Sequence, residues 1–370
     1  MAAVRGGDGR RLRGGTAVSG RDGAPVLFVT NHVPPDRTGA FAALHERVGI
    51  ELALFGGRSH HATGGVEDPG VPHRHVAQRD IAALAARGGP WRAVVCGTAG
   101  RIALPAAYAG ARRGRTPFVL WSALWAPVRT PAHRLAAPLL RRIHADADAV
   151  VVYGPHVAAH ARRQGARCIH TAPQAVDAAF WGAPAPGAAP TARPFTAVFV
   201  GRHAPGKGLD VLLDAWPGVG DGRLSLVGVT ERDTGRPRVP GVTAHGPATP
   251  EEVRNFLADS DVLVVPSVAT PAFREPWGLV ANEAMHQGLP VIATDAVGAA
   301  AGGLVRDGRN GLVVPAGDAT ALRDALVALR EDPALRARLG AAARRDVAPY
   351  TFAAWAEGLR QGIDAAVARA

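Results

Sequence analysis

Residues Phe199–Asp210 read F-V-G-R-H-A-P-G-K-G-L-D, and this segment indicates the fold class of the chain. It joins a short apolar run typical of a buried strand, residues 196–200, to a helical pattern that begins at Leu209. A glycine-rich turn between a strand and a helix lets backbone N–H groups and the positive end of the helix dipole approach an anion. The turn is not a P-loop, because Gly208 follows the lysine where serine or threonine is required. The sequence therefore predicts an α/β unit with an anion site.

Lys207 stands out in this turn because it is the only lysine of the chain. Lysine and arginine together number 42, so all the others are arginine. Lysine carries a compact point charge on a flexible stem, whereas arginine is a planar fork. We interpret Lys207, together with Gly201 and Arg202 at the end of the strand, as ligands for the phosphates of a bound nucleotide. The alternative is an ordinary lysine in a surface turn.

A second group of candidate residues lies at 274–285, which reads R-E-P-W-G-L-V-A-N-E-A-M. A helix that begins near Gly278 would place Glu275 in the loop at its mouth and Glu283 near its second turn. Carboxylates accept hydrogen bonds from paired sugar hydroxyls, and free amides at a helix start bind anions. The pattern indicates a nucleotide-sugar site, although each glutamate alone would also suit a helix-terminal charge or a solvated face. The free amides would be those of Gly278, Leu279 and Val280.

The rest of the chain repeats the strand–helix alternation, which predicts two doubly wound parallel sheets in two Rossmann-like domains that face a cleft. A length of 370 residues also suggests about two domains. A stretch rich in Pro, Ala and Gly separates the two sets of strands. We expect a disordered basic tail (1–24), an N-terminal acceptor-binding domain (25–181), a linker (182–194), a C-terminal donor-binding domain (195–345) and a C-terminal segment (346–370). The expected strands lie at 25–30, 50–55, 93–97, 118–121, 149–153, 196–200, 224–227, 262–265 and 291–293.

Charge is distributed unevenly between the two halves. Residues 1–180 contain 23 arginines and 11 acids, a balance of +12, whereas residues 181–370 contain 19 basic and 20 acidic residues, a balance of −1. A basic half favours an anionic membrane surface, a phosphorylated acceptor or nucleic acid. Its arginines are not interleaved with aromatic residues in a recognisable nucleic-acid module, so we expect no nucleic-acid partner. Coding bias toward arginine is the alternative, but it does not explain the asymmetry.

The composition also narrows the compartment. Two cysteines are too few for a disulfide framework or a metal cluster and suit a reducing setting. No apolar run reaches the roughly 18 residues that a membrane-spanning helix needs. Residues 1–24 lack the apolar core of a signal peptide. We expect a cytoplasmic protein that associates peripherally with the inner face of the membrane.

With these motifs, the sequence resembles the retaining glycosyltransferases of the GT-B fold, of the family-4 type, which are also called glycosyl transferases group 1. The resemblance implies that Arg202 and Lys207 bind the donor diphosphate, that Glu275 contacts the transferred sugar, and that Glu283 binds the ribose. Of these residues, Glu275, Arg202 and Lys207 would be catalytic. It also implies that a final helix, 352–368, crosses back onto the first domain. The matching stretches are 200–208, 261–267, 275–285, 288–294 and 308–318.

The N-terminal half matches this family more loosely. Thr38-Gly39-Ala40 is similar to its glycine loop near donor and acceptor. Many members carry a histidine after the strand that corresponds to residues 118–121, but this chain has Ser122 there. The acceptor-side catalytic residue is therefore not identified, and the remaining candidates are His32, His60, His61 and His133.

Two D-x-D patterns resemble the metal motif of other transferases, at 146–148 and 259–261. Each falls where a helix gives way to a strand, a position where aspartate commonly stabilises the turn. We therefore expect no metal site and metal-independent chemistry.

The sequence thus predicts an enzyme that transfers a hexosyl group from a UDP- or GDP-sugar to an acceptor hydroxyl with retention and without a further cofactor. The acceptor would be a glycan, a lipid-linked molecule or a small molecule, in cell-envelope, polysaccharide or glycoconjugate synthesis. The alternatives are a non-catalytic nucleotide-sugar-binding subunit, a glycogen-type synthase and a sugar-nucleotide epimerase.

Overall fold

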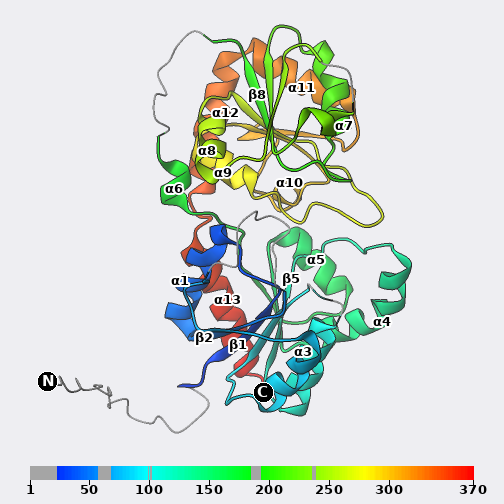
Figure 1. Ribbon diagram of the computed structural model, residues 1–370, viewed down its shortest axis with the longest axis vertical. Coiled ribbons are helices and arrows are strands. Elements are labelled where there is room, and N and C mark those ends of the chain that lie inside the picture. The colour runs from blue at the N-terminus through cyan, green and yellow to red at the C-terminus, as the bar shows by residue number, and fades with distance from the viewer. Residues whose placement is uncertain (1–22, 57–67, 99, 101, 185–192, 236–238) are drawn as a thin grey trace, which may run out of the picture.

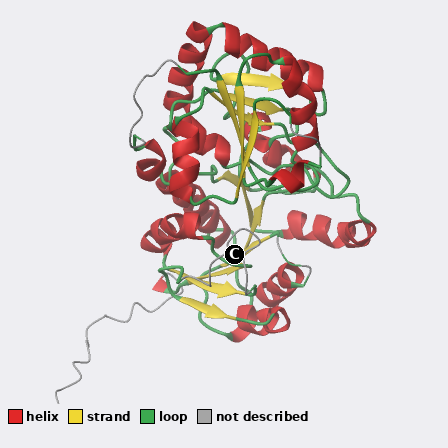
Figure 2. Ribbon diagram, turned by 45° about the horizontal axis from the view of Figure 1, so that its top comes forward, coloured by secondary structure: helices red, strands yellow, loops and turns green. Residues whose placement is uncertain are grey.

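A computed structural model describes residues 23–56, 68–98, 100, 102–184, 193–235 and 239–370. Most of the expected tail and linker, and the candidates His60 and His61, lie outside these described residues. Two parallel sheets with helices on both faces dominate the molecule (Figures 1 and 2), and the predicted doubly wound architecture is confirmed. Within the described residues, no helix is both long enough and apolar enough to cross a membrane.

The first sheet has the strand order β3-β2-β1-β4-β5-β6-β7. The order reverses between β1 and β4, which makes a topological switch point where ligands bind in such sheets. Its strands are β1 (Val26–Thr30), β2 (Ile50–Leu54), β3 (His73–His75), β4 (Val94–Gly97), β5 (Phe118–Ser122), β6 (Ala149–Val152) and β7 (Ile169–Thr171). Its helices are α1 (Thr38–Val48), α2 (Ile81–Arg87), α3 (Ala103–Arg113), α4 (Pro131–Asp146), α5 (Pro155–Arg163) and α6 (Ala178–Gly182).

The second sheet has the order β10-β9-β8-β11-β12-β13, with its switch point between β8 and β11. Its strands are β8 (Thr196–Val200), β9 (Arg223–Val227), β10 (Val242–Gly246), β11 (Val262–Val265), β12 (Val291–Thr294) and β13 (Gly311–Val314). Its helices are α7 (Leu209–Ala215), α8 (Pro250–Ala258), α9 (Val280–His286), α10 (Gly298–Ala301), α11 (Ala319–Glu331) and α12 (Pro333–Val347), and the chain ends in α13 (Phe352–Val367).

All nine expected strands are present, and the strands that the sequence did not predict are β3, β7, β10 and β13. Each of these four is the outermost strand of its sheet. Central strands of a parallel sheet are buried on both faces and show as continuous apolar runs, whereas edge strands do not need them. The exposed His73–His75 strand shows the consequence, because three polar residues carry no strand pattern.

The last helix, α13, returns from the second sheet and packs against α1, β6 and β7 of the first (Figure 1). Two glycines permit this close approach. A Cβ on Gly358 would lie 2.1 Å from the carbonyl oxygen of Thr171, and one on Gly362 would lie 2.3 Å from Cγ2 of Val151. Trp355 between them is fully buried, with its ring 5.3 Å from that of Phe41. The terminal helix is therefore part of the first core.

Candidate functional site

The turn that carries Lys207 has a backbone that only glycine accommodates easily. Gly206 and Gly208 have φ values of +91° and +71°. A Cβ on Gly208 would lie 1.9 Å from the carbonyl oxygen of Pro266, just beyond β11. The backbone N–H of Val268 donates to the carbonyl of Gly206 at 2.8 Å. The turn is thus fastened to the carboxyl end of β11, next to the switch point of the second sheet.

Lys207 meets Glu275 in this structure. Its Nζ donates to Oε2 of Glu275 at 2.5 Å, and the hydroxyl of Ser267 donates to the same oxygen at 3.4 Å. Glu275 is only 7 % exposed, so its charge depends on these partners. The two residues that the sequence singled out separately therefore lie in direct contact, at the carboxyl end of the second sheet.

Arg202 lies at the end of β8, two residues beyond Val200, and its side chain is exposed. It forms no ion pair with any acid of the described residues. Its charge is therefore available to a ligand, whereas the charge of Lys207 is compensated by Glu275.

Glu283 lies in α9, and Glu275 lies in the loop before that helix, as expected. The backbone N–H groups of Leu279 and Val280 have no acceptor among the described residues. Burial, with a smaller contribution from the negative charge of Asp36, raises the pKa of Glu283 to about 8. Asp36 belongs to a short helix of the first domain, Pro35–Arg37. An acid of the first domain therefore lies close enough to Glu283, in the second domain, to act on its charge.

Three residues of the first domain that the sequence did not single out make hydrogen bonds to the loop around Glu275. The indole Nε1 of Trp125 donates to the carbonyl of Glu275 at 3.1 Å, and the backbone N–H of Arg129 donates to Pro271 at 2.7 Å. Nε2 of His156 lies 3.2 Å from the carbonyl of Pro276, so it is the protonated ring nitrogen. Burial is the main cause that lowers the pKa of His156, and Arg274 adds to it. This histidine is therefore neutral at pH 7.

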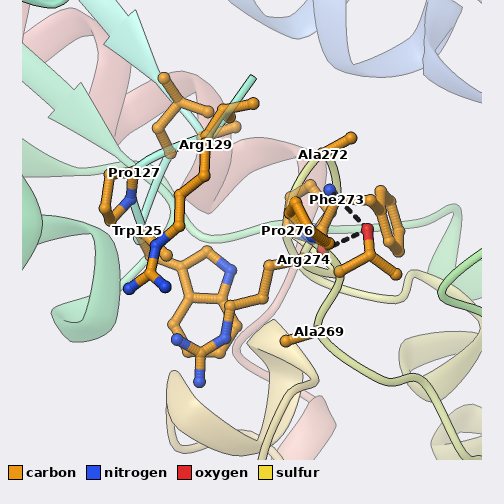
Figure 3. A pocket seen from close by; sticks show the side chains of 14 residues that line it. Trp125, Pro127, Arg129, Ala269, Ala272, Phe273, Arg274 and Pro276 are labelled. Atoms are coloured by element: carbon orange, nitrogen blue, oxygen red, sulfur yellow. Dashed lines mark hydrogen bonds between the residues drawn. The ribbon is translucent and has the colours of Figure 1, made fainter. Parts of the chain in front are cut away.

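A pocket of about 530 Å³ opens where these two segments meet (Figure 3). Residues 123–129 form one wall, and residues 269–274 with Pro276 form the other. The guanidinium of Arg274 lies over the indole of Trp125, with Cζ 3.9 Å from the ring centroid. The side chain of Arg129 extends toward the same indole in Figure 3. We call this cavity the arginine pocket.

Among the described residues, the N-terminal candidates form no hydrogen bond to Lys207 or Glu275. The hydroxyl of Thr38 donates to the carbonyl of Pro35 at 2.9 Å. Gly39 and Ala40 belong to the first turn of α1, which begins at Thr38. A Cβ on Gly39 would lie 2.7 Å from the ring of Phe352, the first residue of α13. Ser122 is fully buried, and its hydroxyl has no partner among the described residues.

The two histidine candidates that the structure describes have local partners. Nδ1 of His32 lies 3.1 Å from the side-chain amide of Asn31, and Nδ1 of His133 lies 2.6 Å from the hydroxyl of Thr130. His133 is exposed at the start of α4. Neither contact involves the residues around Glu275.

Three of the four D-x-D aspartates hold other parts of the protein together. Asp148 accepts from Arg112 at 2.9 Å and from the backbone of Phe118, and Asp261 accepts from Arg193 at 2.8 Å. Asp146 accepts from the hydroxyl of Tyr108 at 2.7 Å. Among the described residues, no three His, Cys, Asp or Glu side chains cluster in a way that could hold a metal ion.

Comparisons with known proteins place this geometry in context. Residues 194–332 match the family model described as "Glycosyl transferases group 1". A phosphatidyl-myo-inositol mannosyltransferase of Mycobacterium leprae is 37% identical over 166 residues, 42% of this chain and 43% of the relative. A D-inositol 3-phosphate glycosyltransferase of Nocardia farcinica is 32% identical over 245 residues, 63% of this chain and 51% of the relative. The chain spans about half the length of these curated relatives.

Solved structures cover more of the chain. Anabaena HepE in complex with UDP and glucose has a TM-score of 0.72 at 18% identity, over 92% of this chain and 99% of that one. Sucrose-phosphate synthase of Thermosynechococcus elongatus has a TM-score of 0.71 at 20% identity, over 91% and 97%. The two-domain arrangement expected from the sequence, the GT-B fold, is thereby confirmed.

Proposed function

We propose that this protein is a glycosyltransferase that uses a nucleoside-diphosphate sugar, since residues 194–332 match the family model described as "Glycosyl transferases group 1". The sugar moves to an acceptor hydroxyl with retention at the anomeric carbon. The observation that carries the proposal is the contact between Lys207 and Glu275, in the domain that also holds Arg202, which forms no ion pair within the described residues. It combines a phosphate-binding cation with a carboxylate suited to sugar hydroxyls, at the carboxyl end of a doubly wound sheet, where ligands bind.

Lys207 and Arg202 act on the departing diphosphate. When the donor binds, Lys207 turns from Glu275 to a phosphate oxygen, and the free amides of Leu279 and Val280 add neutral donors. These groups are in place before the reaction, so they stabilise the developing negative charge without reorganisation. Gly201 and Gly278 allow the backbone to approach the donor closely.

Glu275 and Glu283 bind the two sugars of the donor. The Glu275 carboxylate, once released by Lys207, accepts hydrogen bonds from hydroxyls of the transferred sugar. Glu283 holds the ribose. Its pKa of about 8 means that the carboxyl is largely protonated in the free protein at neutral pH. Ribose hydroxyls that donate to the carboxylate stabilise its charged form, so donor binding releases a proton.

Retention follows from attack on the face that the diphosphate leaves. The bond between the anomeric carbon and the phosphate oxygen breaks, and the acceptor oxygen forms the new bond on the same side. The proton of the acceptor hydroxyl passes to the departing phosphate, so no protein nucleophile and no metal ion is needed. Closure of the cleft excludes water and favours transfer over hydrolysis.

The proposed acceptor is a glycan, a lipid-linked molecule or a small molecule, and the reaction serves the synthesis of the cell envelope, of a polysaccharide or of a glycoconjugate. The names of two relatives, which act on phosphatidyl-myo-inositol and D-inositol 3-phosphate, support a polyol hydroxyl as one option. UDP in the HepE complexes supports a UDP-sugar as donor, with a GDP-sugar as the other choice.

We propose that the protein is cytoplasmic and that its first domain binds peripherally to the anionic inner face of the membrane. Helix α4 supports it, because Leu135 is 86% exposed and Leu139 is 42% exposed, with Arg134 and Arg141 exposed on the same helix. Exposed leucines together with arginines are typical of helices that lie in a membrane interface. Binding to phosphatidylglycerol vesicles should fall steeply with salt, and absent or salt-insensitive binding would contradict this part of the proposal.

A donor screen tests the proposed function directly. UDP-, GDP- and ADP-sugars are added to the protein, and the shift in melting temperature identifies the donor, since a ligand stabilises only the state that binds it. Release of the nucleoside diphosphate is then measured over an acceptor panel. Donor binding with release at background throughout would favour the non-catalytic subunit. A product that is an altered donor sugar, without transfer, would favour an epimerase, and extension of a glucan would favour a glycogen-type synthase.

A further inference from the structure

We propose that the arginine pocket binds a phosphate group of the acceptor through Arg129 and Arg274. This inference rests on the proposed function, because it assigns the substrate class for the acceptor side of the same cleft. Arg129 comes from the first domain and Arg274 from the second, so the site exists only where the two domains meet.

The charge of the pocket points to an anionic ligand. Arg129 and Arg274 are the charged side chains among the described residues that line it, and no acidic side chain lines it. Neither arginine forms an ion pair within the described residues. Two uncompensated guanidinium groups in one cavity repel each other, and an anion between them removes that repulsion. Phosphate suits them because guanidinium groups donate pairs of parallel hydrogen bonds to it.

Arg274 is held in a position from which it can donate. Its guanidinium lies over the indole of Trp125, and Trp125 is itself fixed by its hydrogen bond to the carbonyl of Glu275. An arginine over an aromatic face keeps the N–H groups at its edge free for a ligand. Nε of Arg274 is buried and has no partner among the described residues. A buried donor left without a partner is costly, and a ligand oxygen would satisfy it.

The pocket has the size and place that an acceptor requires. Its volume of about 530 Å³ falls within the usual range for small-molecule sites and admits a phosphate ester of monosaccharide size. Arg274 directly precedes Glu275, and Phe273 in the pocket wall has its ring centroid 5.6 Å from Nζ of Lys207. A phosphate held here therefore leaves the rest of the acceptor beside the residues proposed to bind the transferred sugar.

The test is a calorimetric titration of the whole chain with glycerol 3-phosphate, with glycerol as the neutral control and with UDP present at saturation. Glycerol 3-phosphate should bind and glycerol should not. The substitutions Arg129→Gln and Arg274→Gln should each weaken binding about tenfold, the usual loss for one charge-assisted hydrogen bond. Arg345→Gln is the matched control, since Arg345 is an exposed arginine on α12, outside the pocket. Unchanged melting temperatures confirm that the variants are folded.

A second arm identifies the source of the phosphate. Vesicles of phosphatidylglycerol, compared with phosphatidylcholine, present a phosphate at a lipid surface. Binding of glycerol 3-phosphate that both pocket variants weaken supports a soluble phosphate ester as acceptor. Vesicle binding alone that both variants weaken supports a lipid-linked one.

Three results would overturn the inference: no binding in either arm, binding that both pocket variants leave unchanged, or binding of glycerol 3-phosphate only when UDP is left out, which would make the pocket part of the donor site. The proposed function fails separately, if neither UDP- nor GDP-sugars bind and no nucleoside diphosphate is released.

Discussion

The two domains each carry a glycine at the start of a helix, and the two glycines serve different purposes. Gly208, before α7, has a left-handed backbone and lies against the main-chain oxygen of Pro266, which cannot move aside. Gly39, in α1, lies against the ring of Phe352, a side chain that can. The first glycine shapes a turn that presents Lys207, whereas the second makes room for α13. Similar sequence patterns therefore belong to the proposed donor site in one domain and to a packing contact in the other.

The largest effect should come from Lys207→Ala. It removes the cation proposed to stabilise the leaving diphosphate, and loss of one such preorganised group costs about 10²- to 10³-fold in turnover. Release of nucleoside diphosphate measures it, with Lys207→Arg as the stricter variant, since a planar fork does not replace a point charge. Turnover near that of the wild type would remove Lys207 from the donor site. The cost of leaving Glu275 unpaired is measured separately, as the difference in free energy of unfolding between Lys207→Ala and Lys207→Ala/Glu275→Gln.

Gly208→Ala tests the glycine that lies against a main-chain oxygen. The substitution forces a left-handed backbone on alanine and pushes its Cβ into the carbonyl of Pro266, so unfolding free energy should fall by about 1–3 kcal/mol. Donor affinity should fall as well, because the turn must shift. Denaturant unfolding and a donor titration measure the two. A stable variant with full donor affinity would show that the turn does not need this glycine.

The sequence predicted the second domain better than the first, for a physical reason. The residues around Lys207 and around Glu275 lie in two short contiguous segments, so the pattern of glycines and carboxylates in each segment can be recognised locally. Their direct contact was not predicted. Trp125 and Glu275 are 150 residues apart, and Trp125, Arg129 and His156 matter only because of how two folded domains meet. Tryptophan, arginine and histidine have many roles, so no local pattern distinguishes these three.

The pH dependence of stability tests whether the two domains face each other through Asp36 and Glu283. The folded-state pKa of Glu283 is raised to about 8, so the folded protein binds more protons than the unfolded chain between roughly pH 4.5 and pH 8. Its contribution to stability is therefore present at low pH and lost as the pH rises through 8. Between pH 6 and pH 8 the wild type should lose about 2 kcal/mol relative to Glu283→Gln, measured by urea unfolding.

Asp36→Asn is the control for this prediction. It removes the neighbouring negative charge, which is the smaller of the two causes, so the loss should shrink without disappearing. Identical pH profiles for the wild type and Glu283→Gln would show that the Glu283 carboxyl is well hydrated, and the two acids would then not oppose each other across the cleft.

The smallest effect is expected for Gly39→Ala, because the neighbour of Gly39 is a side chain that can move. Alanine favours the helix by about 0.5–1 kcal/mol over glycine, but its Cβ meets the ring of Phe352, so the two effects should nearly cancel in the free energy of unfolding. In a Phe352→Ala background the contact is gone, and the same substitution should stabilise the protein by about 0.5–1 kcal/mol. Nucleoside diphosphate release should change less than about threefold, because a packing contact lies outside the transition state. A larger loss of turnover at unchanged stability would return Gly39 to the donor loop that its sequence resembles, and the two glycines would then share one purpose.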